Sequence, residues 1–139
     1  MRVVLDTNIL FSALLSPQGS SGAIYKAWRA SKFQLITSTI QLEELRRASR
    51  YPKFKAILKP AQIGTLINNL QNAIVLDKLP VNSNIKIDDP NDAFLVSMTI
   101  AGEADYLVTG DHRAGLLQKK NINQTRIVTP TIFCKRYLL

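Results

Sequence analysis

Residues 106–111, Tyr106-Leu107-Val108-Thr109-Gly110-Asp111, are the stretch that decides the fold predicted by this sequence. Three apolar residues followed at once by a hydroxyl, a glycine and a carboxylate are typical of a parallel strand, covered on both faces, at the point where it leaves its sheet. Open α/β sheets bind their ligands at that edge. The stretch therefore predicts an α/β fold with functional side chains directly after a strand.

The amino terminus repeats this arrangement. Val3-Val4-Leu5 is followed by Asp6-Thr7-Asn8, again a carboxylate and a hydroxyl at the end of an apolar run. Because the carboxyl ends of parallel strands meet at one edge of a sheet, the two strand ends predict one shared site. Asp6, Thr109 and Asp111 are its first candidate residues.

Strands and helices alternate along the rest of the chain. A Ser/Thr cluster at 37–39 offers N-caps for a helical run, and Asp89, Pro90 and Asp92 form a well-capped helix start. The expected strands are 2–5, 33–36, 74–76, 106–108 and 126–128, and the expected helices are 8–15, 23–31, 37–47, 61–72, 93–102 and 130–138. This alternation predicts a three-layer α/β/α sandwich around a central parallel sheet of about five strands.

Length and composition limit the class of protein. The 139 residues fit a single domain, 1–139, which buries about two-thirds of its unfolded surface. The single cysteine, Cys134, excludes an internal disulfide, and no signal-peptide pattern precedes the first strand. The longest nearly apolar run, 9–15, is far shorter than the ~20 residues of a membrane span. We therefore expect a cytoplasmic protein that does not associate with membranes.

The charge of the chain is informative about its partner. There are 18 Lys and Arg residues against 10 Asp and Glu residues, which gives a net charge of +8. Such a balance favours a nucleic acid through phosphate neutralisation, although basic surfaces also serve solubility. Seven of the ten acids lie between residues 77 and 111. A basic chain that concentrates its carboxylates predicts a cation site on a polyanion-binding surface.

Four acidic residues are expected to converge on the edge where the strands end. Asp6 and Asp111 follow strands, Glu44 lies about one turn into the helix after the second strand, and Asp92 opens the helix that follows a polar loop. Oxygen ligands on separate elements suit Mg²⁺ or Mn²⁺. Such ions activate water and stabilise the leaving oxygen of a phosphodiester. The four carboxylates therefore indicate metal-assisted hydrolysis.

Each of these acids also has a purely structural interpretation. Asp6 and Asp92 can act as helix caps, Asp111 can form a turn, and Glu44 can be a solvated charge that pairs with Arg47. Taken singly, the signals are weak. Three strand ends or helix starts with matching chemistry are less easily explained by capping alone.

The order of four short motifs resembles that of the PIN-domain family. The match spans essentially the whole chain at natural spacing, so the combination is specific although each motif is short. The motifs are Leu5-Asp6-Thr7-Asn8, Ser38 through Leu45, Asp89 through Leu95, and Ala104 through Asp111. The similarity is greatest to the bacterial and archaeal group described as toxin components of toxin–antitoxin pairs.

This resemblance implies a Mg²⁺- or Mn²⁺-dependent endoribonuclease, with an antitoxin as possible partner. It implies that Glu44 rather than Glu43 belongs to the site, because the family's acid directly precedes an apolar residue, here Leu45. Arg113 stands where related chains often carry another acid, so the number of metal ions in the site, one or two, stays open. The implied catalytic residues and metal ligands are Asp6, Glu44, Asp92 and Asp111, with Asn8 and Thr109 supporting them.

Basic residues flank the expected site. The connector 46–59 and the loop 112–120 supply cations that would steer an RNA backbone with little sequence preference. His112 is a candidate general base, but a lone histidine in an exposed loop is more often a surface residue or a phosphate contact. The expected nucleic-acid contacts are Arg46, Arg47, Arg50, Lys53, His112 and Arg113.

Two segments bear on assembly. The helix 23–31 and the terminal segment 132–139 carry more large apolar residues than a small core obviously needs. An apolar surplus predicts an interface, and related PIN proteins commonly pair, so we expect a two-fold homodimer. The alternative is that both segments simply pack on the sheet.

Three other functions are alternatives to metal-dependent cleavage. A phosphotransferase that uses Asp6 as nucleophile would need a second acid two positions later, where Asn8 stands. A mononucleotide-binding module would need a glycine-rich turn after the first strand, and residues 6–10 have none. A catalytically silent PIN-like module that binds RNA or a protein stays open, because intact ligands do not prove turnover.

Overall fold

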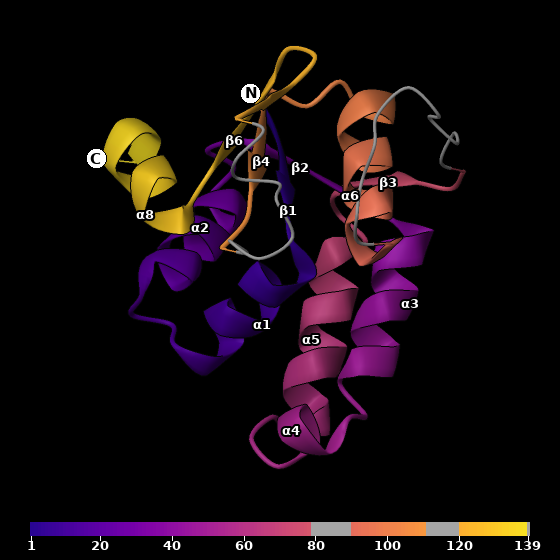
Figure 1. The fold of residues 1–139 in the computed structure, drawn as a ribbon. Helices are drawn as coiled ribbons and strands as arrows, with labels where there is room; N and C mark the ends of the chain where they lie inside the picture. Colours follow the sequence, from indigo (N-terminus) through magenta and orange to yellow (C-terminus); the bar gives the residue numbers. More distant parts are fainter. Residues whose placement is uncertain (79–89, 111–119, 139) are drawn as a thin grey trace.

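A six-stranded sheet forms the centre of the protein in the computed structural model, which describes residues 1–78, 90–110 and 120–138, with the backbone alone at 90–92 (Figure 1). The strand order is β3-β2-β1-β4-β6-β5. The strands are β1 (Arg2–Leu5), β2 (Gln34–Ser38), β3 (Ile74–Leu76), β4 (Tyr106–Val108), β5 (Asn121–Ile122) and β6 (Thr125–Val128). All neighbours pair in parallel except β5, which runs antiparallel to β6. The parallel α/β sheet is confirmed, with six strands instead of about five.

Helices connect these strands and begin or end close to where the sequence predicts. They are α1 (Thr7–Leu15), α2 (Ser20–Arg29), α3 (Thr39–Ala48), α4 (Pro52–Lys55), α5 (Pro60–Leu70), α6 (Pro90–Ala101) and α8 (Pro130–Phe133). The short helix α4 lies in the connector 46–59, for which no helix was expected. The expected terminal helix 130–138 changes to a π-helix over Cys134–Leu138. None of the described helices is long and apolar enough to cross a membrane.

Side chains alternate across the central strands, and both faces of the sheet are buried. Val3 and Leu5 of β1 face a larger core shared with α1, α2, α3, α5 and α8, whereas Val4 faces a smaller core shared with α6. On β4, Val108 faces the larger core and Leu107 the smaller one. Burial on both sides explains why these strands are continuous apolar runs in the sequence. The three-layer arrangement follows from it.

The order of the strands reverses between β1 and β4. The chain adds β2 and β3 on one side of β1, and then β4, β6 and β5 on the other side. Sheets of this kind bind ligands in the crevice outside the carboxyl ends of the strands at such a reversal. Asp6 directly follows β1 and Thr109 directly follows β4. The fold therefore brings these two predicted residues to the expected edge.

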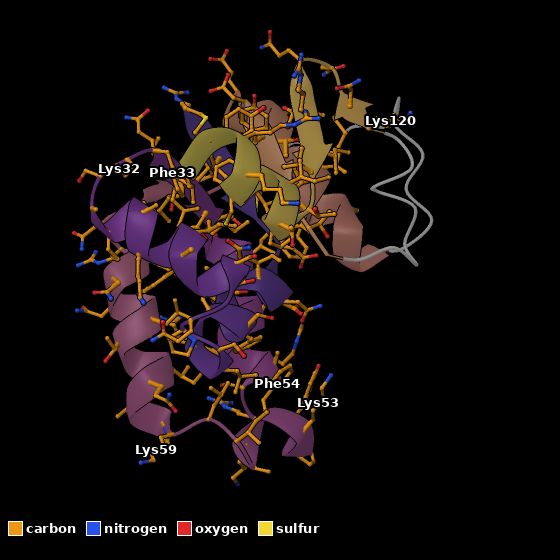
Figure 2. The ribbon with its side chains drawn as sticks, turned by 90° about the vertical axis from the view of Figure 1, so that its left-hand side faces the viewer. Lys32, Phe33, Lys53, Phe54, Lys59 and Lys120 are labelled. Atoms are coloured by element: carbon orange, nitrogen blue, oxygen red, sulfur yellow. The ribbon has the colours of Figure 1, made fainter. Side chains whose placement is uncertain are left out.

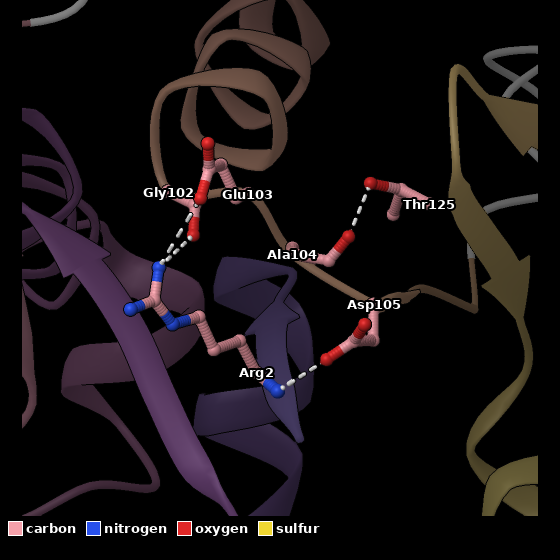
Figure 3. A network of polar contacts seen from close by, with 6 residues as sticks. All are labelled: Arg2, Gly102, Glu103, Ala104, Asp105 and Thr125. Atoms are coloured by element: carbon pink, nitrogen blue, oxygen red, sulfur yellow. Dashed lines mark hydrogen bonds and ion pairs between the residues drawn. The ribbon is translucent and has the colours of Figure 1, made fainter.

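A network of polar contacts at the opposite edge holds the amino ends of the strands (Figure 3). The backbone N–H of Arg2 donates to the Asp105 carboxylate (2.8 Å), and its guanidinium donates to the Gly102 carbonyl (3.0 Å) and pairs with Glu103. The Thr125 hydroxyl donates to the carbonyl at position 104 (2.6 Å). Two of the seven clustered acids, Glu103 and Asp105, therefore belong to a structural network and not to a cation site at the other edge.

The apolar residues that predicted a homodimer are mostly buried inside the chain. Ile24 and Trp28 of α2 and Phe133 of α8 belong to the larger core, and Phe133 packs edge-on against Phe33 and Tyr106. Figure 1 shows α2 and α8 on the same side of the sheet. Both segments therefore pack on the sheet, which was the alternative to a dimer interface. The homodimer stays a prediction, but these apolar residues no longer support it, because most of them are buried within the chain.

Two helix glycines give a matched test of this packing. A Cβ added at Gly22 on α2 would lie 2.1 Å from the carbonyl oxygen of Pro17, whereas one added at Gly64 on α5 would meet no described atom within 4 Å. We expect Gly22→Ala to lower the free energy of unfolding by about 3 kcal/mol or more, because backbone must move. Gly64→Ala should raise it by up to about 1 kcal/mol through helix propensity. Urea denaturation measures both, and equal effects would contradict the packing of α2.

Candidate active site

Asp6 is held at the reversal point by its backbone and by both carboxylate oxygens. Its N–H donates to the Val108 carbonyl (3.0 Å), which joins the ends of β1 and β4. Oδ1 accepts from the backbone N–H of Asn8 (3.2 Å), so Asp6 is the N-cap of α1, and Oδ2 accepts from the Thr109 hydroxyl (2.8 Å). The residue is 7% exposed. Capping does not exclude metal binding, because a carboxylate has about four lone-pair sites.

Thr109 and Asn8 contribute to this arrangement in different ways. Thr109 is fully buried, and its N–H donates to the Val128 carbonyl (3.0 Å), so it connects β1, β4 and β6 through one residue. Its side chain acts directly on the Asp6 carboxylate. Asn8 acts on that carboxylate through its backbone N–H, while the residue itself is exposed.

Gln41 is a buried residue of the site that the sequence analysis missed. Its Nε2 donates to the Leu5 carbonyl (2.7 Å), directly before Asp6, and its Oε1 accepts from the Thr37 hydroxyl (2.6 Å). The Ser38 hydroxyl caps α3 by accepting from the Gln41 N–H (3.1 Å). The signal was present, because a serine followed by glutamine three residues later is a capping-box pattern. Here the glutamine side chain reaches the neighbouring strand instead.

Glu44 lies one turn after Gln41 on α3, and residues three apart lie on the same side of a helix. Its side chain is 21% exposed and pairs with the guanidinium of Arg47, whereas Glu43 is exposed. The hydrogen bond that the Arg47 guanidinium donates to the Glu44 carboxylate raises the pKa of Arg47 above its usual value. The ion pair between Glu44 and Arg47, which the structural interpretation of Glu44 required, therefore exists, and the Glu44 side chain in it is half-buried.

The two remaining predicted ligands are only partly within the described residues. Asp92 lies in the first turn of α6, which begins at Pro90 as predicted, but its side chain lies outside the described part. Asp111, His112 and Arg113 lie outside it altogether. Within the described residues, no three His, Cys, Asp or Glu side chains gather as a metal site. The convergence of all four acids therefore stays a prediction.

The donors that are described fit a hard divalent cation. Asp6 and Glu44 offer carboxylate oxygens, which Mg²⁺ and Mn²⁺ prefer. Beside Asp6, the Thr7 hydroxyl is buried and has no hydrogen-bond partner among the described residues. A buried hydroxyl without a partner costs roughly 1–3 kcal/mol, so a water or ligand at this place would be stabilised. The chemistry of the donors is consistent with an oxygen-ligated ion.

The four residues of the expected RNA contacts that the structure describes, all basic, do not share one surface. Arg47 lies on the side of α3 that carries Glu44, and Lys53 of α4 lies over the Phe54 ring, 5.2 Å from its centroid (Figure 2). Arg46 and Arg50 instead line a groove between α3 and α5. A two-residue step turns about 200° around a helix axis, which explains why Arg46 and Glu44 point apart.

The role of Gln41 in positioning Asp6 can be tested by substitution. Gln41→Leu would leave the Leu5 carbonyl and the Thr37 hydroxyl buried without partners, so we expect a loss of roughly 1–3 kcal/mol in the free energy of unfolding. Gln34→Leu, the same change at an exposed glutamine at the start of β2, should alter it by less than about 0.5 kcal/mol. Thermal denaturation measures both variants, and a neutral Gln41→Leu would mean that this link is not needed.

Comparison with known proteins places this geometry in a family. A family model described as PIN domain matches residues 2–113. The uncharacterized protein MJ1680 of Methanocaldococcus jannaschii is 27% identical over 137 residues, which cover 94% of this chain and 86% of that protein. A chain from the crystal structure of VapBC2 from Rickettsia felis, bound to a DNA fragment from their promoter, superposes with a TM-score of 0.59 at 20% identity, over 93% of this chain and 98% of that chain. At that identity the similarity concerns the fold alone. Because the family model covers most of the chain, from β1 past Thr109, this protein belongs to the PIN-domain family.

Proposed function

We propose that this protein is a divalent-metal-dependent endoribonuclease, the toxin of a toxin–antitoxin pair, with residues 1–139 acting as one PIN domain. PIN domains are generally nucleases that use divalent metal ions. The observation that carries the proposal is the buried Asp6 carboxylate, oriented by Thr109 and Asn8 where the strand order reverses. A carboxylate held in this way at a ligand-binding edge supports a catalytic role.

Each part of the site has a proposed task. Asp6, Glu44, Asp92 and Asp111 hold the ion, directly or through waters, and Glu44 completes the ligand set or orients the attacking water. Thr109 keeps the Asp6 carboxylate in one orientation, as outer-shell hydrogen bonds do in metal sites. Bound there, Mg²⁺ or Mn²⁺ would activate water and stabilise charge on the leaving oxygen.

The substrate contacts are proposed from charge and position. Arg47 and Lys53, with His112 and Arg113, would contact RNA phosphates and steer the strand toward the acidic residues. Such contacts position the nucleic acid but read little of its sequence. The net charge of +8 supports a polyanionic substrate.

A protein partner belongs to the same proposal. The Rickettsia felis structure is of VapBC2 bound to a DNA fragment from their promoter, which supports an antitoxin as partner of this chain. A cytoplasmic homodimer is proposed as the assembly on which the antitoxin acts.

One observation favours the alternative, a catalytically silent PIN module that binds RNA or a protein. Glu44 is engaged by Arg47, and a carboxylate held by a guanidinium is less available to a metal ion. The two functions differ in whether divalent metal binds at Asp6.

The metal site is tested by Asp6→Asn and Asp111→Asn. Asparagine caps helices as well as aspartate, so Asp6→Asn should stay folded while it loses Mn²⁺ binding and Mn²⁺-dependent cleavage of single-stranded RNA. Calorimetry and a gel assay measure the two properties. Asp105→Asn removes the same charge at the opposite edge and should cut as the wild type does. If Asp6→Asn and Asp111→Asn also cut at the wild-type rate, the assignment of the site is wrong.

The neighbouring glutamates provide a second test. Glu44→Gln should lower the cleavage rate about 10²-fold or more if Glu44 binds the ion or orients water. Glu43→Gln, an equal change on an exposed side chain, should leave the rate unchanged. Single-turnover cleavage at saturating Mn²⁺ measures both variants. The reverse order of effects would assign the catalytic role to Glu43, and two unchanged rates would mean that cleavage needs neither glutamate. Absence of cleavage by the wild type would favour the silent module.

A further inference from the structure

A groove separates two helices that extend away from the sheet. Helices α3 and α5 run side by side, and α4 lies at their far end (Figure 1). The groove between α3 and α5 has a volume of about 640 Å³, within the range of ligand-binding sites. Its described lining comes from residues 46–50, at the end of α3, and from residues 55–67, and includes neither Asp6 nor Glu44. The groove is therefore distinct from the candidate active site.

The floor of the groove is apolar. Leu58 and Ile63 are buried side chains of the larger core that also line the groove, and Ile67 is half-buried beside them. Ile57, next to this floor in the chain, is 55% exposed, which is high for a large apolar residue. Such a floor is suited to aliphatic side chains of a partner.

The rim of the groove is cationic. Arg46, Arg50 and Lys55 line it, and the described lining residues include no acid and no aromatic side chain. Bases of single-stranded RNA stack on aromatic rings or on guanidinium planes, and of these the described lining offers only the guanidinium groups of Arg46 and Arg50. An apolar floor with a positive rim is complementary to a segment with aliphatic and acidic side chains. The composition of the groove therefore favours a peptide over a nucleic acid.

Gly64 is an independent indication of close approach. It lies in the middle of α5 and lines the groove, and a Cβ added there would meet no described atom within 4 Å. Glycine weakens a helix relative to alanine, and no packing among the described residues requires it here. A glycine on a groove wall lets another chain approach the helix backbone closely.

The walls of the groove are held in place by the rest of the fold. The Phe54 ring of α4 stacks on Phe11 of α1, with centroids 4.5 Å apart and planes at 22°. Gln62 accepts from the N–H of Lys59 (2.8 Å) at the start of α5. A preformed groove requires little reorganisation when a partner binds.

We propose that the α3–α5 groove is a docking site for an acidic, amphipathic segment of a partner protein. Aliphatic side chains of that segment lie over Leu58 and Ile63 and beside Gly64, and its carboxylates pair with Arg46, Arg50 and Lys55. The proposal concerns a surface apart from the acidic residues and does not depend on RNA cleavage.

The test uses a fluorescein-labelled peptide of roughly 15 residues, long enough to form a helix, with leucines at helical spacing and glutamates between them. Matched probes replace every glutamate by lysine or every leucine by serine, and a labelled single-stranded RNA is the fourth probe. Fluorescence anisotropy with the full chain should show binding of the Glu/Leu peptide and much weaker binding of the other two peptides.

Variants locate that binding on the groove. Gly64→Leu fills the groove while it improves helix propensity, and we expect it to lower the affinity for the Glu/Leu peptide about tenfold or more. The double variant Arg46→Ala with Arg50→Ala should lower this affinity to a similar extent without adding bulk. Lys26→Ala removes an exposed charge on α2, away from the groove lining, and should leave the affinity unchanged. Circular dichroism confirms that each variant is folded.

Other results would overturn the proposal. Absence of Glu/Leu peptide binding at millimolar concentration excludes an acidic amphipathic occupant, and undiminished binding by both groove variants places the peptide elsewhere. If the RNA probe binds the wild type, and Gly64→Leu weakens binding of the RNA but not of the peptide, the groove is a nucleic-acid surface. None of these measurements uses cleavage, so a failure of the proposed nuclease activity is distinguishable from a failure of this docking site.

Discussion

The hydrogen bond from the Thr109 hydroxyl to the Asp6 carboxylate is the interaction on which both the sheet and the site depend. A carboxylate that is 7% exposed is costly unless donors satisfy it. Thr109 and the N–H of Asn8 provide such donors, and the N–H of Asp6 itself joins the ends of β1 and β4. The contacts that place these strands side by side therefore also orient the carboxylate. In a low-dielectric interior such bonds are strong, which gives the site its rigidity.

The buried polar contacts around Gln41 extend this rigidity to the helices on both faces. Gln41 connects α3 to the end of β1, and the Ser38 hydroxyl reaches the sulfur of Met98 on α6 (3.3 Å). These contacts connect the helix that carries Glu44 and the helix that carries Asp92 to the carboxyl ends of β1 and β2. A site assembled from several elements needs this kind of support, because ligands held by hydrogen-bonded neighbours keep their geometry before a metal binds.

Helix α3 serves two surfaces because its charged residues point in different directions. Glu44 and Arg47 pair on one side, whereas Arg46 lines the groove toward α5, together with Arg50 just after the end of the helix. The basic connector is therefore not one electrostatic patch. Charge composition gives the sign of a partner's charge, but the direction of each side chain decides which partner meets which cation.

The sequence by itself determined the α/β class, the order of the elements and the residues at the strand ends. Apolar runs buried on both faces and capping residues are local signals, so β1, β4, Asp6, Thr109 and the start of α6 at Pro90 were all predictable. Only the tertiary structure decided what depends on contacts between distant segments. The two-residue strand β5 exists through pairing with β6, and the side chain of Gln41 finds its partners on two neighbouring strands. Glu103 and Asp105, close in sequence to the site acids, lie at the opposite edge because a strand of three residues separates its two ends in space. Spacing along a chain does not encode which edge of a sheet, or which side of a helix, a residue will face once the layers have packed.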